Sequence, residues 1–365
     1  MKKIIISIIT LLVLFSAISC RMISDQSSLS EESRSSESSD AGIATNELPE
    51  RIEDDYSARN AHVVIDAVVD IGEVQPDQEV ELGFSELLAE QITNVLVYDQ
   101  YPDIEPYRGS NEYAEYDLIK AREGEELSLL HVMISTDGDF KYFEPINNIN
   151  NEYGITGDGE YHDVFDQGYI ADVIPDGMII TAEEAAMQVA DFFEQFTIFT
   201  YEPYNVTAYN NQFEDNLGFY KVYLTPYYNG IPLLTKNGAN INCPIMPEAC
   251  ISNTSIFSAQ GFVVFDVVNT NHIEHLASFN DIYEDFKSRV TVLAEGDTIT
   301  VSNVSLAYLP MTMANGNRLL VPAWCFDCID KGVYADSGNM DGQSFEHEIC
   351  LIYNAENGNF WDVYY

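Results

Sequence analysis

The chain has 365 residues, of which 46% are hydrophobic and 12% aromatic, so it is long enough to bury one large or two moderate cores. Sixty acidic residues against sixteen basic ones give a formal charge of −44. A field of that sign repels nucleic acid and anionic lipid headgroups, which excludes nucleic-acid binding. It favours cationic ligands, Ca²⁺ or a basic partner surface, although acidity also serves solubility alone.

Residues 1–20 have the pattern of a secretory signal peptide, with two lysines, an apolar run and small residues ending at Cys20. The run from Ile4 to Ile18 is about 15 residues, whereas a permanent membrane span needs roughly 20. Ala17–Cys20 resembles the lipobox of bacterial lipoproteins, in which the cysteine is acylated and becomes the mature N-terminus, although that family usually has Leu at the position of Ala17. We predict lipidation at Cys20 and an extracytoplasmic, membrane-anchored location. An ordinary cleaved signal and an uncleaved anchor are the alternatives.

Residues 21–60 are rich in Ser, Glu and Asp and nearly free of aromatic side chains. Such a segment buries too little apolar surface to offset its ordering entropy, so we predict a disordered acidic tether. About 40 residues of flexible chain reach roughly 35 Å. The tether would therefore let a folded part stand clear of the membrane.

The pattern of residues 61–176 predicts an N-terminal α+β domain, which ends near Asp176–Gly177. The β-branched run His62–Ile71 predicts a strand, and apolar residues at helical spacing predict a helix over Phe84–Val97. Asp99–Glu126 is expected to be irregular, and Leu127–Phe143 a hairpin around Asp137–Gly138. The Gly- and Asn-rich segment Asn147–Gln167 follows.

Residues 177–365 predict a duplicated module, with units 177–277 and 278–365. Each unit reads as an amphipathic helix, an Asn-Gly hairpin and further strands. The first helix opens at the capping box Thr181–Glu184 and the second at Ser278. The strands of the first unit are expected at 218–225, 231–234 and 261–268, and those of the second at 298–309, 318–326 and 345–353. The predicted fold class is α+β: duplicated modules of a helix packed on an antiparallel β-meander, after an N-terminal α+β region.

Several turn and hydrophobic positions carry a family resemblance: Tyr223–Pro232, Tyr308–Pro310, Leu320–Trp324 and Leu351–Ala355. In this pattern the chain resembles an uncharacterised family of clostridial (Firmicutes) lipoproteins. That family is distantly similar to YycH and YycI, extracytoplasmic regulators of a cell-wall sensor kinase, and to PepSY-type modules. The resemblance implies a fold and a place at the envelope, and it brings no catalytic residues.

Five cysteines follow Cys20, and in an exported protein two disulfides with one remaining thiol are expected. Cys243 and Cys250 bracket a Pro-containing loop and can close it with a disulfide. Trp324-Cys-Phe-Asp-Cys328 echoes the WCxxC motif of thioredoxin-like oxidoreductases, but no amphipathic helix follows to lower a thiol pKa. Because strand residues three apart face opposite sides, we favour structural roles for Cys325, Cys328 and Cys350 over redox or metal chemistry.

Other polar clusters are weak as sites. His272 and His275 flank Glu274 without the HExxH spacing, so a surface linker is favoured over a metal site, and a solvated face is expected for His347. The acidic segments Thr136–Asp139 and Thr156–Asp163 lack the EF-hand pattern of Ca²⁺ loops.

The 23 tyrosines are densest between Tyr201 and Tyr228, where they serve strand packing or recognition of a sugar or peptide. The chain has no G-x-S-x-G elbow, no P-loop and no GxGxxG after a strand. We therefore expect no enzyme, cofactor or metal. The predicted function is a lipid-anchored extracytoplasmic binding or regulatory protein whose partner is an envelope or sensor protein. The alternative is a small-ligand or glycan-binding lipoprotein.

Overall fold

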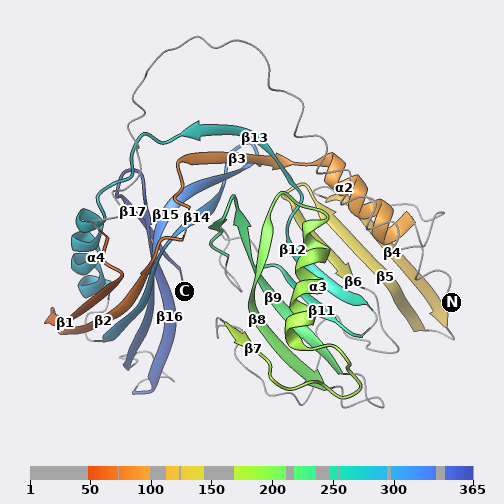
Figure 1. The fold of residues 1–365 in the computed structure, drawn as a ribbon, viewed down its shortest axis with the longest axis horizontal. Coiled ribbons are helices and arrows are strands. Elements are labelled where there is room, and N and C mark those ends of the chain that lie inside the picture. Colours follow the sequence, from red (N-terminus) through yellow and green to blue (C-terminus); the bar gives the residue numbers. More distant parts are fainter. Residues whose placement is uncertain are drawn as a thin grey trace, which may run out of the picture. The chain divides into compact units, whose positions relative to one another are not determined.

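The computed structural model describes residues 48–72, 74–98, 112–122, 125–143, 168–210, 218–235, 246–253, 255–293, 297–333 and 342–364. These residues belong to one compact unit, Ala41–Tyr365. They form two mixed β-sheets with a few short helices (Figure 1). This β-rich α+β architecture agrees with the predicted fold class.

The first sheet has the order β1-β2-β14-β15-β16-β17, and β3 pairs with both β13 and β15. Only the β2–β14 pair is parallel among these pairs. The strands are β1 (Arg51–Ala58), β2 (Ala61–Asp70), β3 (Gln78–Phe84), β13 (Phe265–His272), β14 (Thr298–Thr312), β15 (Arg318–Val333), β16 (Ser344–Asn354) and β17 (Phe360–Tyr364).

The second sheet has the order β4-β5-β6-β12-β11-β9-β8-β7, with β10 on β9. Its strands are β4 (Glu112–Arg122), β5 (Glu125–Ser135), β6 (Asp139–Phe143), β7 (Tyr169–Ile170), β8 (Thr200–Asn210), β9 (Gly218–Tyr228), β10 (Ile231–Pro232), β11 (Glu248–Ile251) and β12 (Ile256–Phe262). The predicted turn at Asn229–Gly230 is confirmed, because both residues have positive φ (51° and 81°), as a tight hairpin turn requires.

Each of the two longer helices buries its apolar stripe against one sheet. Helix α3 (Ala182–Glu194) begins at the predicted capping box and contacts β8, β9 and β11. Helix α4 (Phe279–Leu293) contacts β2, and the Phe286 ring stacks on Phe326 of β15 at 4.2 Å between centroids. The apolar faces predicted for both helices are confirmed as buried: Ala182, Ala185, Val189, Phe193 and Phe196; Phe279, Ile282, Phe286 and Val290.

The chain crosses between the sheets at Val263–Val264. The apolar run predicted as one strand, 261–268, is in fact two strands, because β12 ends at Phe262 in the second sheet and β13 begins at Phe265 in the first. The two valine N–H groups both donate to the Gly138 carbonyl, at 3.1 and 3.2 Å. An apolar sequence is compatible with either sheet, so only these tertiary bonds set the break.

Tyr308 of β14 joins the sheets. Its hydroxyl donates to the Gln78 carbonyl at 2.9 Å, and its ring meets Tyr228 of β9 edge-on at 6.2 Å. Its carbonyl accepts a bond from the Leu234 N–H at 2.8 Å. Tyr308 therefore belongs to the same hydrophobic cluster as the α3 face of the second sheet.

Some expectations from the sequence were wrong. The tether ends earlier than residue 60, because Arg51–Ala58 pairs with β2 and buries Ile52. Part of the segment expected to be irregular, Asp99–Glu126, is strand β4, which is stabilised by its pairing with β5. Strand β8, which pairs with β9, was not predicted. The boundary placed near Asp176–Gly177 does not coincide with a division between sheets, since β6 from before it pairs with β12 from after it.

Helix α2 (Glu86–Thr93) and the π-helical turn η2 (Asn94–Tyr98) confirm the predicted first helix. The predicted strand at His62–Ile71, the hairpin around Gly138 and the Asn315–Gly316 turn are likewise confirmed. The predicted acidic segment 147–167 lies outside the described residues.

Candidate functional site

A ten-residue loop, Ala171–Ile180, precedes helix α3 and is fixed by bonds from Asn253 and from strand β9; we call it the apolar loop. The Asn253 side chain accepts from the Ile179 N–H at 2.6 Å and donates to the Gly177 carbonyl at 2.5 Å. The Gly218 N–H donates to the Asp176 carbonyl at 2.8 Å. These bonds hold the backbone of the loop in one conformation.

Two residues of β9 allow the apolar loop to lie this close. A Cβ added to Gly218 would come within 2.3 Å of the Pro175 Cβ and 2.7 Å of the Asp176 carbonyl oxygen, so only glycine fits. The Tyr220 hydroxyl donates to the carbonyls of Val173 (3.4 Å) and Ile180 (3.3 Å) at the two ends of the loop. The sequence of β9 is thus matched to the loop as well as to the sheet.

The side chains of the apolar loop divide into anchors and exposed residues. Pro175 and Met178 are buried. In contrast, Val173 is 53% exposed, Ile174 51% and Ile179 81%. Exposed apolar side chains that share one ordered loop are typical of interaction sites, because their exposure contributes nothing to folding.

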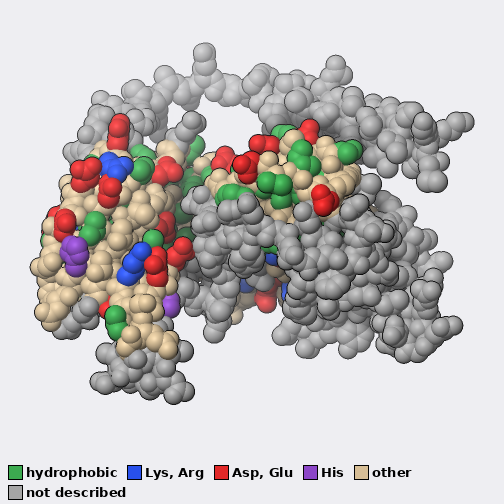
Figure 2. Space-filling model, turned by 90° about the horizontal axis from the view of Figure 1, so that it is seen from below, with side chains coloured by type: hydrophobic (Ala, Val, Ile, Leu, Met, Phe, Trp, Pro, Cys, Tyr) green, Lys and Arg blue, Asp and Glu red, His purple; other side chains and the backbone are tan. Residues whose placement is uncertain are grey.

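The surroundings of the apolar loop are acidic. Asp172, Asp176, Glu183 and Glu184 are all exposed, and no Lys or Arg occurs anywhere from residue 142 to residue 220. Figure 2 shows hydrophobic and acidic side chains lying next to one another on the described surface. The surface therefore combines apolar contact groups with charge of one sign.

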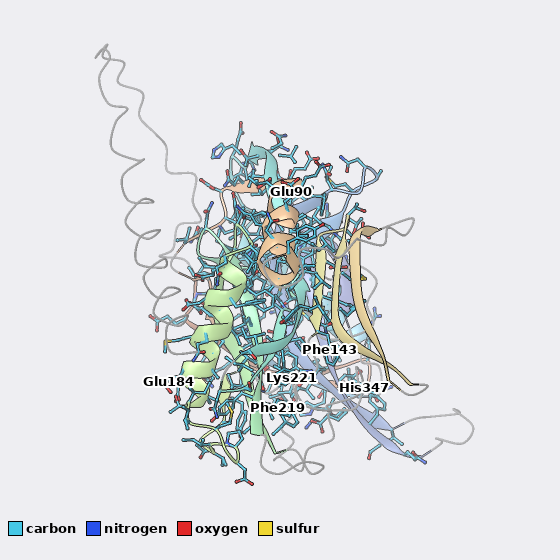
Figure 3. All side chains as sticks on the ribbon, turned by 90° about the vertical axis from the view of Figure 1, so that its right-hand side faces the viewer. Glu90, Phe143, Glu184, Phe219, Lys221 and His347 are labelled. Atoms are coloured by element: carbon cyan, nitrogen blue, oxygen red, sulfur yellow. The ribbon has the colours of Figure 1, made fainter. Side chains whose placement is uncertain are left out.

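A second candidate is a polar network on the other face of the same sheet. Figure 3 shows Glu184 of α3 on one side of the sheet and Lys221 and Phe219 on the other. The Lys221 ammonium lies 3.1 Å from Glu248 Oε2 and 4.7 Å from the centre of the Tyr223 ring. The Gln260 amide donates to Glu248 Oε1 at 3.0 Å. Both oxygens of the carboxylate thus have partners, as a half-buried charge requires.

The protonation states of this network leave it without a reactive nucleophile. Burial, and then the nearby Glu248, raise the pKa of the Cys250 thiol to about 12 against the opposing effect of Lys221. Burial lowers the pKa of Lys221, but the charge of Glu248 and the hydroxyl of Tyr223 outweigh it, so the net shift is upward. Burial also raises the pKa of Tyr223. At neutral pH the thiol and the phenol are protonated and the ammonium is charged, so this group holds strands together and offers no thiolate.

The structure describes four of the six cysteines. Cys20 and Cys243 lie outside the described residues, so neither lipidation nor a Cys243–Cys250 disulfide is tested. No disulfide joins any two of the four described cysteines, so the expectation of two disulfides is not met by them. Cys325 and Cys328 lie in different hydrophobic clusters on opposite faces of β15, as predicted from their spacing. Cys350 shares the cluster of Cys325.

The histidine clusters predicted to be at the surface are exposed. His272, Glu274 and His275 are exposed around the buried Ile273, and His347 is exposed with its ring 5.0 Å from that of Phe345. Within the described ranges no three His, Cys, Asp or Glu side chains gather closely enough to hold a metal ion. Of the acidic loops, 136–139 forms the β5–β6 turn, and 156–163 lies outside the described residues.

The tyrosine-rich stretch is mostly a packing surface. Tyr220 is fully buried, and Tyr201, Tyr223 and Tyr228 are 6%, 7% and 9% exposed. None of the helices in the described part of the chain is both long and apolar enough to cross a membrane. Sequence reasoning did not single out the apolar loop, although the run Val173-Ile-Pro-Asp-Gly-Met-Ile-Ile180 is unusually apolar for a loop.

Comparisons with known proteins give information on the fold alone. The structure is similar to the crystal structure of an uncharacterized protein from Eubacterium rectale, with a TM-score of 0.57 and 13% sequence identity. The match covers 87% of this chain and 95% of that one. No protein-family model and no curated protein matches the sequence.

Proposed function

We propose that the chain is a non-enzymatic, lipid-anchored protein of the extracytoplasmic membrane face that binds a partner protein of the cell envelope. The observation that carries the proposal is the apolar loop, whose backbone is held by Asn253, Gly218 and Tyr220 while Val173, Ile174 and Ile179 are exposed. An ordered loop loses little conformational entropy on binding. The signal-like start, the lipobox-like Cys20 and the acidic segment behind it support the location.

The partner proposal is tested by chemical crosslinking and pull-down from intact cells. Burying an exposed Val or Ile side chain in an interface contributes about 1–2 kcal/mol, so losing two of them weakens binding more than tenfold. We expect Val173→Ser with Ile179→Ser to lose the envelope protein that the wild-type chain recovers. Val68→Ser is the matched control, because Val68 is 50% exposed but lies on β2. Recovery of no envelope protein above background by the wild-type chain would refute the proposal.

The anchor is tested by Cys20→Ser. We expect release of the protein into the medium or accumulation of the uncleaved precursor, which fractionation and immunoblotting detect. A Cys20→Ser protein that stays membrane-bound and is processed normally would show that lipidation is wrong.

The alternative of a glycan- or small-ligand-binding lipoprotein would need an accessible aromatic platform. On the Lys221 face, Phe219 is 2% exposed and Tyr223 7% exposed, so these rings offer little surface for stacking. Tyr209 stacks on Phe219 at 5.1 Å between centroids and covers it further. The exposed apolar loop therefore favours a protein partner.

We also propose that residues 177–277, with α3 and β8–β13, and residues 278–365, with α4 and β14–β17, are duplicated modules, related distantly to PepSY-type modules and to YycH and YycI. Support comes from a helix on one sheet face in each unit, followed by strands that are sheet neighbours in chain order, β8-β9-β11-β12 and β14-β15-β16-β17. The Asn229–Gly230 turn follows the second of these strands and the Asn315–Gly316 turn follows the first. Superposition of the two units tests this: different strand connections around the helix would contradict duplication.

A further inference from the structure

We propose that the apolar loop docks into a protein surface that combines an apolar recess with a rim of lysine and arginine side chains. This inference rests on the proposed function and names the chemistry of the partner. Val173, Ile174 and Ile179 would enter the recess, and the exposed carboxylates of Asp172, Asp176 and Glu183 would face the basic rim.

The sequence around the apolar loop carries only negative charge. Asp172, Glu183 and Glu184 are exposed, and residues 142–220 contain neither Lys nor Arg. Charges of one sign beside an apolar contact steer a partner of the opposite sign and raise the rate of encounter. An uncharged or acidic recess would bring these carboxylates against a surface that does not compensate their desolvation.

This negative charge disfavours an anionic membrane or a second copy of the chain as the occupant. A bilayer with anionic headgroups would repel Asp172, Asp176, Glu183 and Glu184 as the loop approached. A second copy of this chain would bring the same acidic rim and a formal charge of −44 toward its equal. Like charges across an interface oppose association. A basic protein surface is the occupant that the charge favours.

The backbone of the apolar loop is preorganised for binding. The distance between the Asn253 oxygen and the Ile179 N–H is 2.6 Å, and the Met178 N–H donates to the Pro175 carbonyl at 3.0 Å, which closes a turn inside the loop. Ile179 is 81% exposed beside that turn. The most exposed apolar side chain thus lies at the most strongly held part of the loop, as a binding anchor requires.

The experiment places the photocrosslinking residue p-benzoylphenylalanine at Ile179 of the full chain in intact cells, with Val68 as the control position. Two double variants are compared, each adding the same charge: Asp172→Lys with Glu183→Lys near the loop, and Glu90→Lys with Glu274→Lys elsewhere. All four residues are exposed. Circular dichroism and the unfolding midpoint check that each variant is folded.

We expect a protein adduct from position 179 and none from position 68. The loop-side charge reversal should lower its yield at least tenfold, and the distant reversal should change it less than twofold. Mass spectrometry should map the crosslink to a peptide with apolar residues and Lys or Arg. An adduct with lipid or with a second copy, or equal yields in both double variants, would overturn the inference.

The two proposals fail differently. If position 179 gives no adduct while chemical crosslinking of the wild-type chain still recovers an envelope protein, the docking surface is wrong and the proposed function stands. If neither method recovers a partner, the proposed function falls and this inference falls with it.

Discussion

Replacing Asn253 by Ala should loosen the apolar loop without unfolding the protein. The change removes two hydrogen bonds, from the Ile179 N–H and to the Gly177 carbonyl. At about 0.5–1.5 kcal/mol each, they contribute roughly 1–3 kcal/mol to the free energy of local opening. Because amide exchange follows the opening equilibrium, the Ile179 amide should exchange roughly 5- to 150-fold faster.

Native-state hydrogen exchange measured by NMR or mass spectrometry checks this prediction. Asn317→Ala is the matched control, because Asn317 donates to Glu81 at 2.6 Å far from the loop in sequence and should leave the Ile179 amide unchanged. If the Ile179 amide already exchanges at the rate of an unstructured chain in the wild-type protein, or if Asn253→Ala leaves it protected, the loop is not held as the structure shows. Docking by a preorganised loop would then be excluded.

Three further predictions concern stability. Phe286→Ala removes a fully buried ring stacked on Phe326 and should lower the free energy of unfolding by about 3–5 kcal/mol in urea titrations; a loss below 1 kcal/mol would contradict the packing. Glu248→Gln leaves the half-buried ammonium of Lys221 without its carboxylate and should destabilise by about 1–3 kcal/mol, whereas Glu90→Gln, at an exposed position, should have little effect. Burial raises the pKa of the Cys250 thiol to about 12 in the folded state, from its usual value of 9.0. Between about pH 9 and pH 12 the Cys250 thiol is deprotonated in the unfolded chain but not in the folded one, so the free energy of unfolding falls by up to about 1.4 kcal/mol per pH unit. In Cys250→Ala this fall should be less steep.

Local patterns in the sequence were enough for the helices and hairpins. Thr181 and Glu184 form the reciprocal bonds of a capping box at 3.2 and 2.9 Å, and the apolar stripes of α3 and α4 are buried as their spacing requires. Asn229 and Gly230 adopt the positive φ values that a tight hairpin turn needs. Each of these features depends on residues fewer than about fifteen positions apart, so the chain specifies them without knowledge of its tertiary contacts.

Which strands share a sheet was not determined locally. Strand β2 lies parallel to β14, more than 200 residues later, and β6 pairs with β12, so the predicted division of the chain at residue 176 follows neither sheet. The run around Val263 and Val264 is apolar on both sides of the crossover, and only their bonds to the Gly138 carbonyl separate β12 from β13. Pairing partners depend on distant backbone groups, which hydrophobic periodicity does not encode.

The sequence by itself determined an acidic composition and the local signals of the helices and turns. The tertiary structure decided that Val173, Ile174 and Ile179 are exposed on a fixed loop, whereas similar apolar residues in β9 are buried. The physical reason is that exposure depends on what packs against a side chain. Gly218 and Asn253, which fix the loop, lie 42 and 76 residues further along the chain than their partners Asp176 and Gly177.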